Sequence, residues 1–393
     1  MELLIRGGRL VDGTRADVAI DGGVIVDMHA PRETTAGEVV DATGLVIVPG
    51  LVDAHRHVWQ AALRGAGPDW ALPGYLRVVL GRALAGYGPA EARLAALLGA
   101  AEALNAGITT VFDWSNTTRT PEHTDAVLQA YREAGIRAVV GHTNPDDEPD
   151  VRRLAGLTGT ITGGLAVFGS DRDGWESAIP AIRRGRDLGM TVAVHAGGGP
   201  GELDRLRAAG LLGPHLQLVH VNQVTAATAA LFADTGAHAV VTPVVEATMG
   251  HGPSAYTRLA VAGMRPGLGT DVMVDAPADL FETMRATLRA HRLETGTAHP
   301  AGAFLAAATV DGAAAIGLGD RVGVLAAGRR ADLILLDGLA HLDGDLSGAI
   351  VTTSGPGDVH TVVVDGRIRK RAGRLVDLDL AALRRQAAPL GPR

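Results

Sequence analysis

Short apolar segments alternate with longer amphipathic ones through the middle of this 393-residue chain. Eight of the apolar segments have the length of buried strands, and helical patterns or loops separate them. We predict strands at 51–57, 109–114, 138–142, 165–169, 192–195, 217–221, 239–242 and 267–271. Repeated strand and helix units predict a parallel sheet, and eight of them fit a closed (β/α)8 TIM barrel of the α/β class.

The segments between these strands differ in character. Residues 89–106 and 124–134 have the clearest helical periodicity, and each is followed by a glycine that is typical of a helix end. Residues 60–88 and 143–160 are rich in Gly, Pro and Asp, so we predict long loops there. In a barrel, such loops would form the lid of a pocket.

Both ends of the chain are rich in short β segments. The first fifty residues predict strands at 3–6, 8–11, 16–20 and 24–26, and the far end predicts strands at 332–337 and 359–367. Asp21-Gly22-Gly23 is a strong hairpin signal between two of them. We predict that residues 1–50 and 320–393 form one composite β-sandwich domain beside a catalytic barrel at 51–319.

Composition narrows the function classes. The net charge of −7 argues against a nucleic-acid partner, which would need clustered Lys and Arg, so a small-molecule substrate is expected. No apolar stretch approaches the roughly 20 residues of a membrane span, and the first residues do not resemble a secretory signal. The expectation is therefore a cytoplasmic protein without a membrane partner. Cysteine is absent, so any metal must be held by His, Asp or Glu.

Histidines and a carboxylate stand at the ends of four predicted strands. His55 and His57 point to the same side of an extended strand, because side chains alternate. His195, His220 and Asp271 close three later strands, and all these ends meet at one mouth of a barrel. Imidazoles with one carboxylate suit Zn²⁺, Fe²⁺ or Mn²⁺ with a position left for water. The metal would lower the pKa of that water toward about 7, and Asp271 could accept its proton.

This order of residues resembles the amidohydrolase superfamily over essentially the whole chain. The resemblance rests on His195, His220 and the motifs PGLVDAHRH at 49–57, NAGITTV at 105–111, GTD at 269–271 and GVLAAGRRADL at 323–333. It implies a metal-bearing barrel with a β-sandwich from both termini, and hydrolysis at C–N bonds, frequently ring deamination. Binuclear members commonly use a carboxylated lysine at the end of strand 4, and the corresponding segment 164–170 has no lysine. The resemblance therefore favours one ion held by His55, His57, His195 and Asp271.

The cytosine deaminase, guanine deaminase and chlorotriazine hydrolase branch is the most similar. In that branch a Gln can follow the paired histidines, so Gln60 and its neighbour Trp59 are expected to contact substrate, unless Gln60 only begins a helix. Deaminases of the branch usually carry a proton-shuttling Glu three residues after the strand 5 His, but position 198 is Gly. Either Glu246 acts as the general acid, or the reaction needs none. The alternative for Glu246 is a solvated residue in a loop, without a catalytic role.

Four further residues complete the predicted site. By resemblance, His220 polarises the group under attack, although a structural core histidine is the alternative. Asn222, Trp114 and His251 are expected to bind substrate, with ordinary structural roles as their alternatives. The main functional prediction is a metal-dependent hydrolase or deaminase acting on a small nitrogen-containing ring or amide. A lyase or isomerase of specialised metabolism is the alternative that Gly198 suggests. Like many soluble enzymes, the chain is expected to form a homo-oligomer.

Overall fold

Eight parallel strands form the larger domain in the computed structural model, which describes residues 1–30, 35–169 and 174–391. They pair in sequence order: β6 (Leu51–Arg56), β7 (Ile108–Ser115), β8 (Arg137–His142), β9 (Ile161–Phe168), β10 (Thr191–Ala196), β11 (Leu216–His220), β12 (His238–Val241) and β13 (Gly267–Leu268). Beyond β13, Asp271 forms a parallel bridge to Arg56 of β6. This bridge closes the circle, so the predicted (β/α)8 TIM barrel is confirmed.

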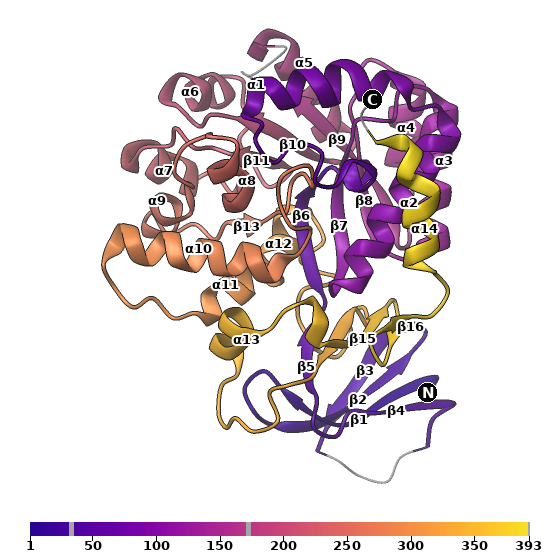
Figure 1. Ribbon diagram of the computed structural model, residues 1–393. Helices are drawn as coiled ribbons and strands as arrows, with labels where there is room; N and C mark the ends of the chain where they lie inside the picture. The colour runs from indigo at the N-terminus through magenta and orange to yellow at the C-terminus, as the bar shows by residue number, and fades with distance from the viewer. Residues whose placement is uncertain (31–34, 170–173, 392–393) are drawn as a thin grey trace.

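Helices surround the barrel and alternate with its strands (Figure 1). They are α2 (Pro89–Asn105), α3 (Pro121–Ala134), α4 (Glu148–Ala155), α5 (Gly174–Asp187), α6 (Pro200–Ala208), α7 (Ala226–Ala233), α8 (Pro243–Thr248), α9 (Tyr256–Val261), α10 (Leu280–Thr295), α11 (Gly302–Ala307) and α12 (Val310–Ala315). Helix α3 ends at Gly135, whose φ of +68° is the left-handed conformation that favours glycine. The prediction that this helix ends before a glycine is therefore confirmed.

Side chains fill the interior of the barrel. Val52, Phe112, Ala166 and Val219 point into it from four different strands and are completely buried. A second apolar layer lies between the strands and the surrounding helices, which explains why these strands are apolar along most of their length. Polar side chains therefore have room mainly at the carboxyl ends of the strands.

Strands from both termini form a separate sheet below the barrel in Figure 1. The strands are β1 (Leu3–Leu10), β2 (Arg15–Asp21), β3 (Val24–His29), β4 (Glu38–Asp41), β5 (Val46–Pro49), β14 (Leu333–Leu336), β15 (Val359–Val364), β16 (Arg367–Arg371) and β17 (Arg374–Leu375). Gly22 and Gly23 have positive φ angles between antiparallel β2 and β3, as the hairpin signal predicts. The two termini thus pair around a common apolar core, as expected.

Two strand predictions at the termini are wrong in detail. The predicted strands 3–6 and 8–11 are one strand, β1, which ends at Leu10, because an irregularity between Ile5 and Gly8 lets the ladder continue past Gly7. The segment 359–367 is a hairpin instead of a single strand, because Asp365 and Gly366 adopt positive φ angles and turn β15 into β16.

Both predicted lid loops contain helices. Residues 60–88 include most of η1 (Val58–Leu63), all of α1 (Leu72–Tyr75), the π-helix η2 (Leu76–Ala83) and η3 (Leu84–Gly86), and residues 143–160 contain α4. Proline and aspartate begin these helices instead of breaking them: Pro73 and Pro149 occupy first turns, and Asp147 accepts a hydrogen bond from Asp150 N in α4. The lid is therefore more ordered than its composition suggests.

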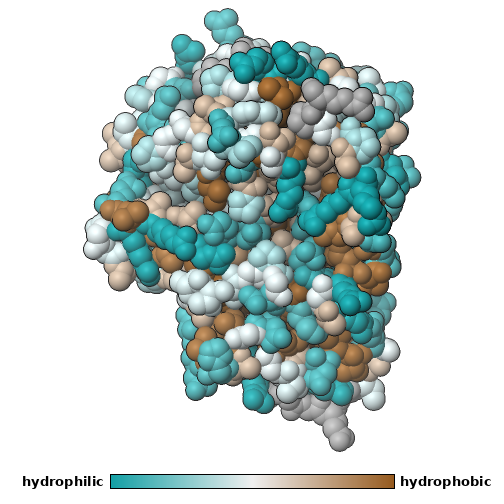
Figure 2. All heavy atoms as spheres, in the orientation of Figure 1, coloured by the Kyte–Doolittle hydropathy of each residue, from teal (hydrophilic) through white to brown (hydrophobic). Residues whose placement is uncertain are grey.

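The C-terminal helix α14 (Leu380–Ala387) runs along barrel helix α2, where the Arg384 guanidinium contacts the Glu102 carboxylate at 2.7 Å. A further helix, α13 (Ser347–Thr353), packs against α10 and α11. Figure 2 shows hydrophilic and hydrophobic residues interspersed on the face drawn there. Among the described residues, no helix combines the length and apolar character needed to cross a membrane. The domain division at 51–319 stays a prediction.

Candidate active site

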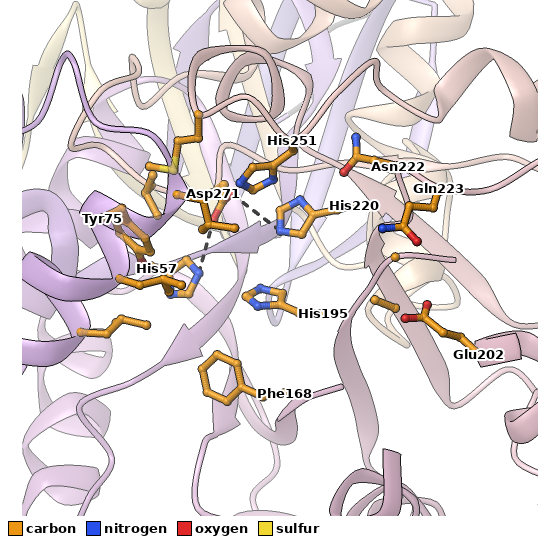
Figure 3. A pocket seen from close by; sticks show the side chains of 17 residues that line it. His57, Tyr75, Phe168, His195, Glu202, His220, Asn222, Gln223, His251 and Asp271 are labelled. Atoms are coloured by element: carbon orange, nitrogen blue, oxygen red, sulfur yellow. Dashed lines mark ion pairs between the residues drawn. The ribbon is translucent and has the colours of Figure 1, made fainter. Parts of the chain in front are cut away.

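A cavity of about 440 Å³ lies at the carboxyl ends of the barrel strands (Figure 3). Apolar side chains from the lid and from strand ends cover one side, and polar side chains from the loops after β10, β11 and β12 cover the other. The lining residues are His57, Leu72, Tyr75, Leu76, Leu80, Phe168, His195, Ala196, Gly197, Glu202, His220, Asn222, Gln223, Met249, His251, Asp271 and Val272. This is the end of the barrel where the sequence predicts the site.

Four predicted ligands converge at the floor of this cavity. His55 Nε2 and His57 Nε2 each lie 3.3 Å from Asp271 Oδ1, and His195 Nε2 lies 3.2 Å from His55 Nε2. Neighbouring ligands of a tetrahedral zinc ion, at 2.0–2.2 Å from the metal, are separated by about 3.3 Å. Residues far apart in sequence thus present nitrogen and oxygen atoms at the mutual spacing of ligands to one ion.

The protonation of these groups also fits a divalent ion. Burial lowers the pKa of His55 to about 3, so its imidazole is neutral at physiological pH, as a metal ligand must be. Burial alone would raise the pKa of Asp271, but its close contacts with His55 and His57 hold the pKa well below its usual range. A neutral imidazole beside a carboxylate is a donor set that suits borderline metals. The residues therefore fit a divalent metal.

Backbone strain places the Asp271 carboxylate. Asp271 has a φ of +61°, in the left-handed region that few residues other than glycine adopt. Its N–H donates to His55 O and its carbonyl accepts from His57 N, both at 2.9 Å. The preceding Thr270 donates its N–H and hydroxyl to the buried Asp53 carboxylate, at 2.9 and 2.5 Å. These contacts outweigh the strain and fix the ligand against β6.

His220 also has a strained backbone, with φ +72°, which turns its ring toward the cavity. Its Nδ1 lies 3.1 Å from the Thr242 hydroxyl and 3.5 Å from Glu246 Oε1, and its Nε2 lies 4.0 Å from Asp271 Oδ2 (Figure 3). The ring is thus oriented from behind, and Nε2 is the nitrogen nearer to Asp271. This position suits a group that polarises a substrate beside the metal.

Glu246 is neither a solvated loop residue nor part of the cavity wall. It is completely buried in α8, where Oε1 accepts the Thr242 N–H at 2.8 Å and lies near His220. Its Oε2 is buried and has no hydrogen-bond partner in the described part of the chain. The arrangement does not support direct proton donation from Glu246 to substrate, because His220 and Thr242 stand in front of it.

Three other predicted contact residues lie behind the wall. Trp59 is buried, and its indole donates to Asn116 Oδ1 at 3.0 Å. Gln60 donates to the hydroxyl of Tyr75 at 2.6 Å, so the lining residue is Tyr75. Trp114 stacks on the His195 ring with 3.7 Å between centroids. These contacts hold lining residues in place, and they do not support direct substrate contact by Trp59, Gln60 or Trp114.

Asn222 and His251, which the sequence predicts to contact substrate, both line the cavity. Glu202 lines it too, which sequence reasoning missed. The Glu202 carboxylate accepts the Gly198 N–H at 2.6 Å. Gly198 has a φ of +77°, and a Cβ there would lie 2.8 Å from the Val221 Cβ, so this backbone leaves no room for a side chain at position 198. The sequence signal that could have identified Glu202 is its position in the first turn of the helix that follows the His195 strand.

A second group of potential ligands, His142, Asp147 and Asp150, is satisfied internally. His142 Nδ1 accepts the Asn144 N–H at 3.1 Å, so Nε2 carries the proton and donates to Asp150 Oδ2 at 3.1 Å. Asp150 also pairs with Arg153. Both ring nitrogens of His142 are therefore in use, and this group is structural.

Known proteins have sequences similar to this one. The chain is 30% identical to the 5-methylthioadenosine/S-adenosylhomocysteine deaminase of Halobacterium salinarum, over 94% of this chain and 93% of that protein. It is 26% identical to the 5'-deoxyadenosine deaminase of Methanosarcina mazei, over 94% and 91% of the two chains. These relatives are hydrolytic enzymes by name, which supports the hydrolase or deaminase prediction over the lyase or isomerase alternative.

Solved structures show the same fold. A zinc-bound adenosine deaminase of Xanthomonas campestris superimposes with a TM-score of 0.87 at 24% identity, over 99% of this chain and 97% of that one. A mutant of the atrazine chlorohydrolase TrzN of Arthrobacter aurescens, complexed with zinc and atraton, gives 0.86 at 24% identity over 99% of both chains. The family model described as "Amidohydrolase family" matches residues 46–369. The chain therefore belongs to the amidohydrolase family.

Proposed function

We propose that this protein is a zinc-dependent hydrolase that replaces an exocyclic amino group of a nitrogen heterocycle with oxygen from water. The observation that carries the proposal is the convergence of His55, His57, His195 and Asp271 at ligand spacing beneath the cavity. A divalent ion bound there would lower the pKa of a coordinated water toward about 7 and act as a Lewis acid. The ligand set also accepts iron or manganese, and zinc is favoured because solved neighbours contain it.

Two side chains act on the reacting atoms in this proposal: Asp271 transfers the proton, and His220 donates a hydrogen bond. Asp271 Oδ2 lies 4.0 Å from His220 Nε2, so both groups can face the same reacting atom. Asp271 accepts the proton of the attacking water and delivers it to the leaving nitrogen, which departs as ammonia. His220 donates a hydrogen bond from Nε2 to the ring position that gains negative charge, while Glu246 and Thr242 orient the ring from its other side. The scheme needs no carboxylate at position 198.

The cavity favours an uncharged substrate. Its described lining contains neither Lys nor Arg, and it includes the carboxylates of Glu202 and Asp271. Away from the proposed ion, a phosphate or carboxylate would therefore meet negative charge without a cationic side chain to pair with. Leu72, Tyr75 and Phe168 offer flat or apolar contact for an aromatic ring. We infer a neutral nitrogen heterocycle, with adenosine-type nucleosides first because the relatives' names include them.

The test is a substrate panel assayed for ammonia release by the zinc-loaded protein. It includes 5'-methylthioadenosine, 5'-deoxyadenosine, S-adenosylhomocysteine and AMP, with chelator-treated protein as the control. We expect a neutral nucleoside to be converted and AMP to be turned over at least about tenfold less well, because one unpaired buried charge exceeds about 1.4 kcal/mol. Product formed in heavy-oxygen water must contain the label. Turnover without label would favour a non-hydrolytic reaction.

We also propose that the protein is a homo-oligomer and that it is located in the cytoplasm. Light scattering on the zinc-loaded protein would measure the first, and fractionation of the source cells the second. A monomer, or recovery outside the cytoplasm, would remove that part of the proposal without affecting the chemistry.

A further inference from the structure

Asn116 follows β7 and is buried beside the ligand His57. Its Oδ1 lies 2.7 Å from His57 Nδ1 and 3.0 Å from the indole Nε1 of Trp59. His57 Nε2, on the opposite side of the ring, is the atom that faces Asp271 at 3.3 Å. The amide thus contacts the nitrogen of His57 that points away from the proposed ion.

The chemistry of Trp59 determines how this group is protonated. An indole N–H is only a donor, so the Asn116 atom that faces it must be the amide oxygen and not the amide nitrogen. The same oxygen faces His57 Nδ1, and an oxygen without a proton can only accept. His57 must therefore carry its proton on Nδ1, which leaves the lone pair of Nε2 free for a metal.

We propose that Asn116 is a positioning residue that fixes the tautomer and ring orientation of His57 and thereby sets the affinity for the metal. This inference rests on the proposed function, because it assumes that His57 is a metal ligand. Loss of the hydrogen-bond partner behind a ligating imidazole typically changes metal affinity by about 10–100-fold. Nδ1 of the neighbouring ligand His55 has no hydrogen-bond partner among the described residues, so only His57 of this pair is held in this way.

The lid and the C-terminal segment support the amide. Trp59 packs edge-on against Tyr87, with 4.9 Å between ring centroids. The hydroxyl of Tyr87 donates to the carbonyl of Leu390 at 3.1 Å. The indole that orients Asn116 therefore packs on a ring that is itself hydrogen-bonded to the last turn of the described chain, and His57 is buried.

The test measures the zinc dissociation constant of the full chain by competition with a fluorescent chelator. Asn116→Leu removes the acceptor at similar size, and we expect it to raise Kd by about 10–100-fold. Asn116→Asp keeps an acceptor oxygen toward both donors, and we expect zinc binding at least as tight as in the wild type. The increase in unfolding temperature on adding zinc should shrink in the leucine variant and persist in the aspartate variant.

Thr117→Val is the matched control. Its hydroxyl is buried in the same turn and has no hydrogen-bond partner in the described chain, so zinc affinity should stay within about twofold. Equal Kd for Asn116→Leu and wild type overturns the inference, and so does an equal loss in the aspartate and leucine variants. Should the leucine variant not fold, Trp59→Phe decides: it frees the amide to rotate, and an unchanged Kd overturns the tautomer argument. Wild-type protein that binds no zinc overturns the proposed function instead.

Discussion

His55, His57 and Asp271 form what we call the metal side of the cavity. Each is buried, and the Asp271 backbone is hydrogen-bonded to those of His55 and His57. Glu202 and Asn222 are on the mouth side, on segments that follow β10 and β11, and they are only partly buried. Substitution on the metal side breaks several contacts together, whereas substitution on the mouth side changes one surface of the cavity. The comparison indicates that residues of the metal side determine the reaction and residues of the mouth side determine which substrate binds.

The largest expected effect is on the metal side. Asp271→Asn removes the proton acceptor and one ligand charge, so we expect kcat to fall by about 10²–10⁴-fold and zinc content to drop. Steady-state kinetics and metal analysis on the purified protein measure both. Glu202→Gln on the mouth side is the control and should keep one zinc per chain. Full activity of Asp271→Asn would place the proton transfer on another residue.

Removal of zinc tests whether the metal side is held partly by the ion. At free zinc about 100-fold above Kd, the ion should stabilise the folded state by about 2.7 kcal/mol, because it binds the unfolded chain poorly. Calorimetry with and without chelator should therefore show a lower unfolding temperature for the metal-free protein. The same shift is expected for Glu202→Gln. An unfolding temperature that does not respond to chelator contradicts a structural contribution of the ion.

Asp275 allows a test through pH. Burial, with the nearby negative charge of Asp271, raises the pKa of Asp275 to about 6, and neither carboxylate oxygen has a hydrogen-bond partner among the described residues. A folded pKa above the unfolded value means that stability is lost as the pH rises from about 4 through 6. Asp275→Asn should therefore stabilise the protein by about 1 kcal/mol at pH 8, discounted for partial exposure, and not at pH 4.

Thermal unfolding of wild type and Asp275→Asn across this pH range gives the measurement. A benefit that is equal at pH 4 and pH 8 would show that the carboxyl does not titrate as described. Bound zinc should reduce the benefit, because it neutralises part of the charge on Asp271.

The smallest expected effect is on the mouth side. Glu202→Gln keeps the side-chain shape and an acceptor for the Gly198 N–H, but it replaces a carboxylate of the cavity lining with a neutral amide, which would accept a hydrogen bond from a substrate less strongly. We expect KM to rise about two- to tenfold with kcat unchanged, which corresponds to one ordinary hydrogen bond. Kinetics with the best nucleoside of the panel measures this. A fall in kcat at constant KM would assign Glu202 to the chemical step.

The sequence predicts those parts of the molecule that depend on local pattern. Barrel strands are apolar over their length, and a histidine or aspartate directly after such a run must appear at the mouth. The clustering of His55, His57, His195 and Asp271 at the barrel mouth can therefore be predicted from the chain alone. The metal-side residues follow from strand order, because parallel strands bring their carboxyl ends together.

Features that depend on tertiary contact were not predictable. Pro73 and Pro149 lie in the first turns of helices, although proline is also common in loops. Glu246 points behind His220, and Glu202 takes part in the cavity, because of backbone turns at Gly198 and His220 that no local pattern specifies. Asn116 is a polar residue after a strand, but its role is visible only once Trp59 lies against it.

The bridge between Arg56 and Asp271 has a consequence for synthesis of the chain. His55 belongs to the first barrel strand to leave the ribosome, and Asp271 follows the last one. A nascent chain holds three of the four proposed ligands before the fourth exists, and it lacks the bridge between Arg56 and Asp271. Tight capture of the ion is therefore a late event, and a truncated polypeptide would be distinguished from a finished one by its failure to retain metal.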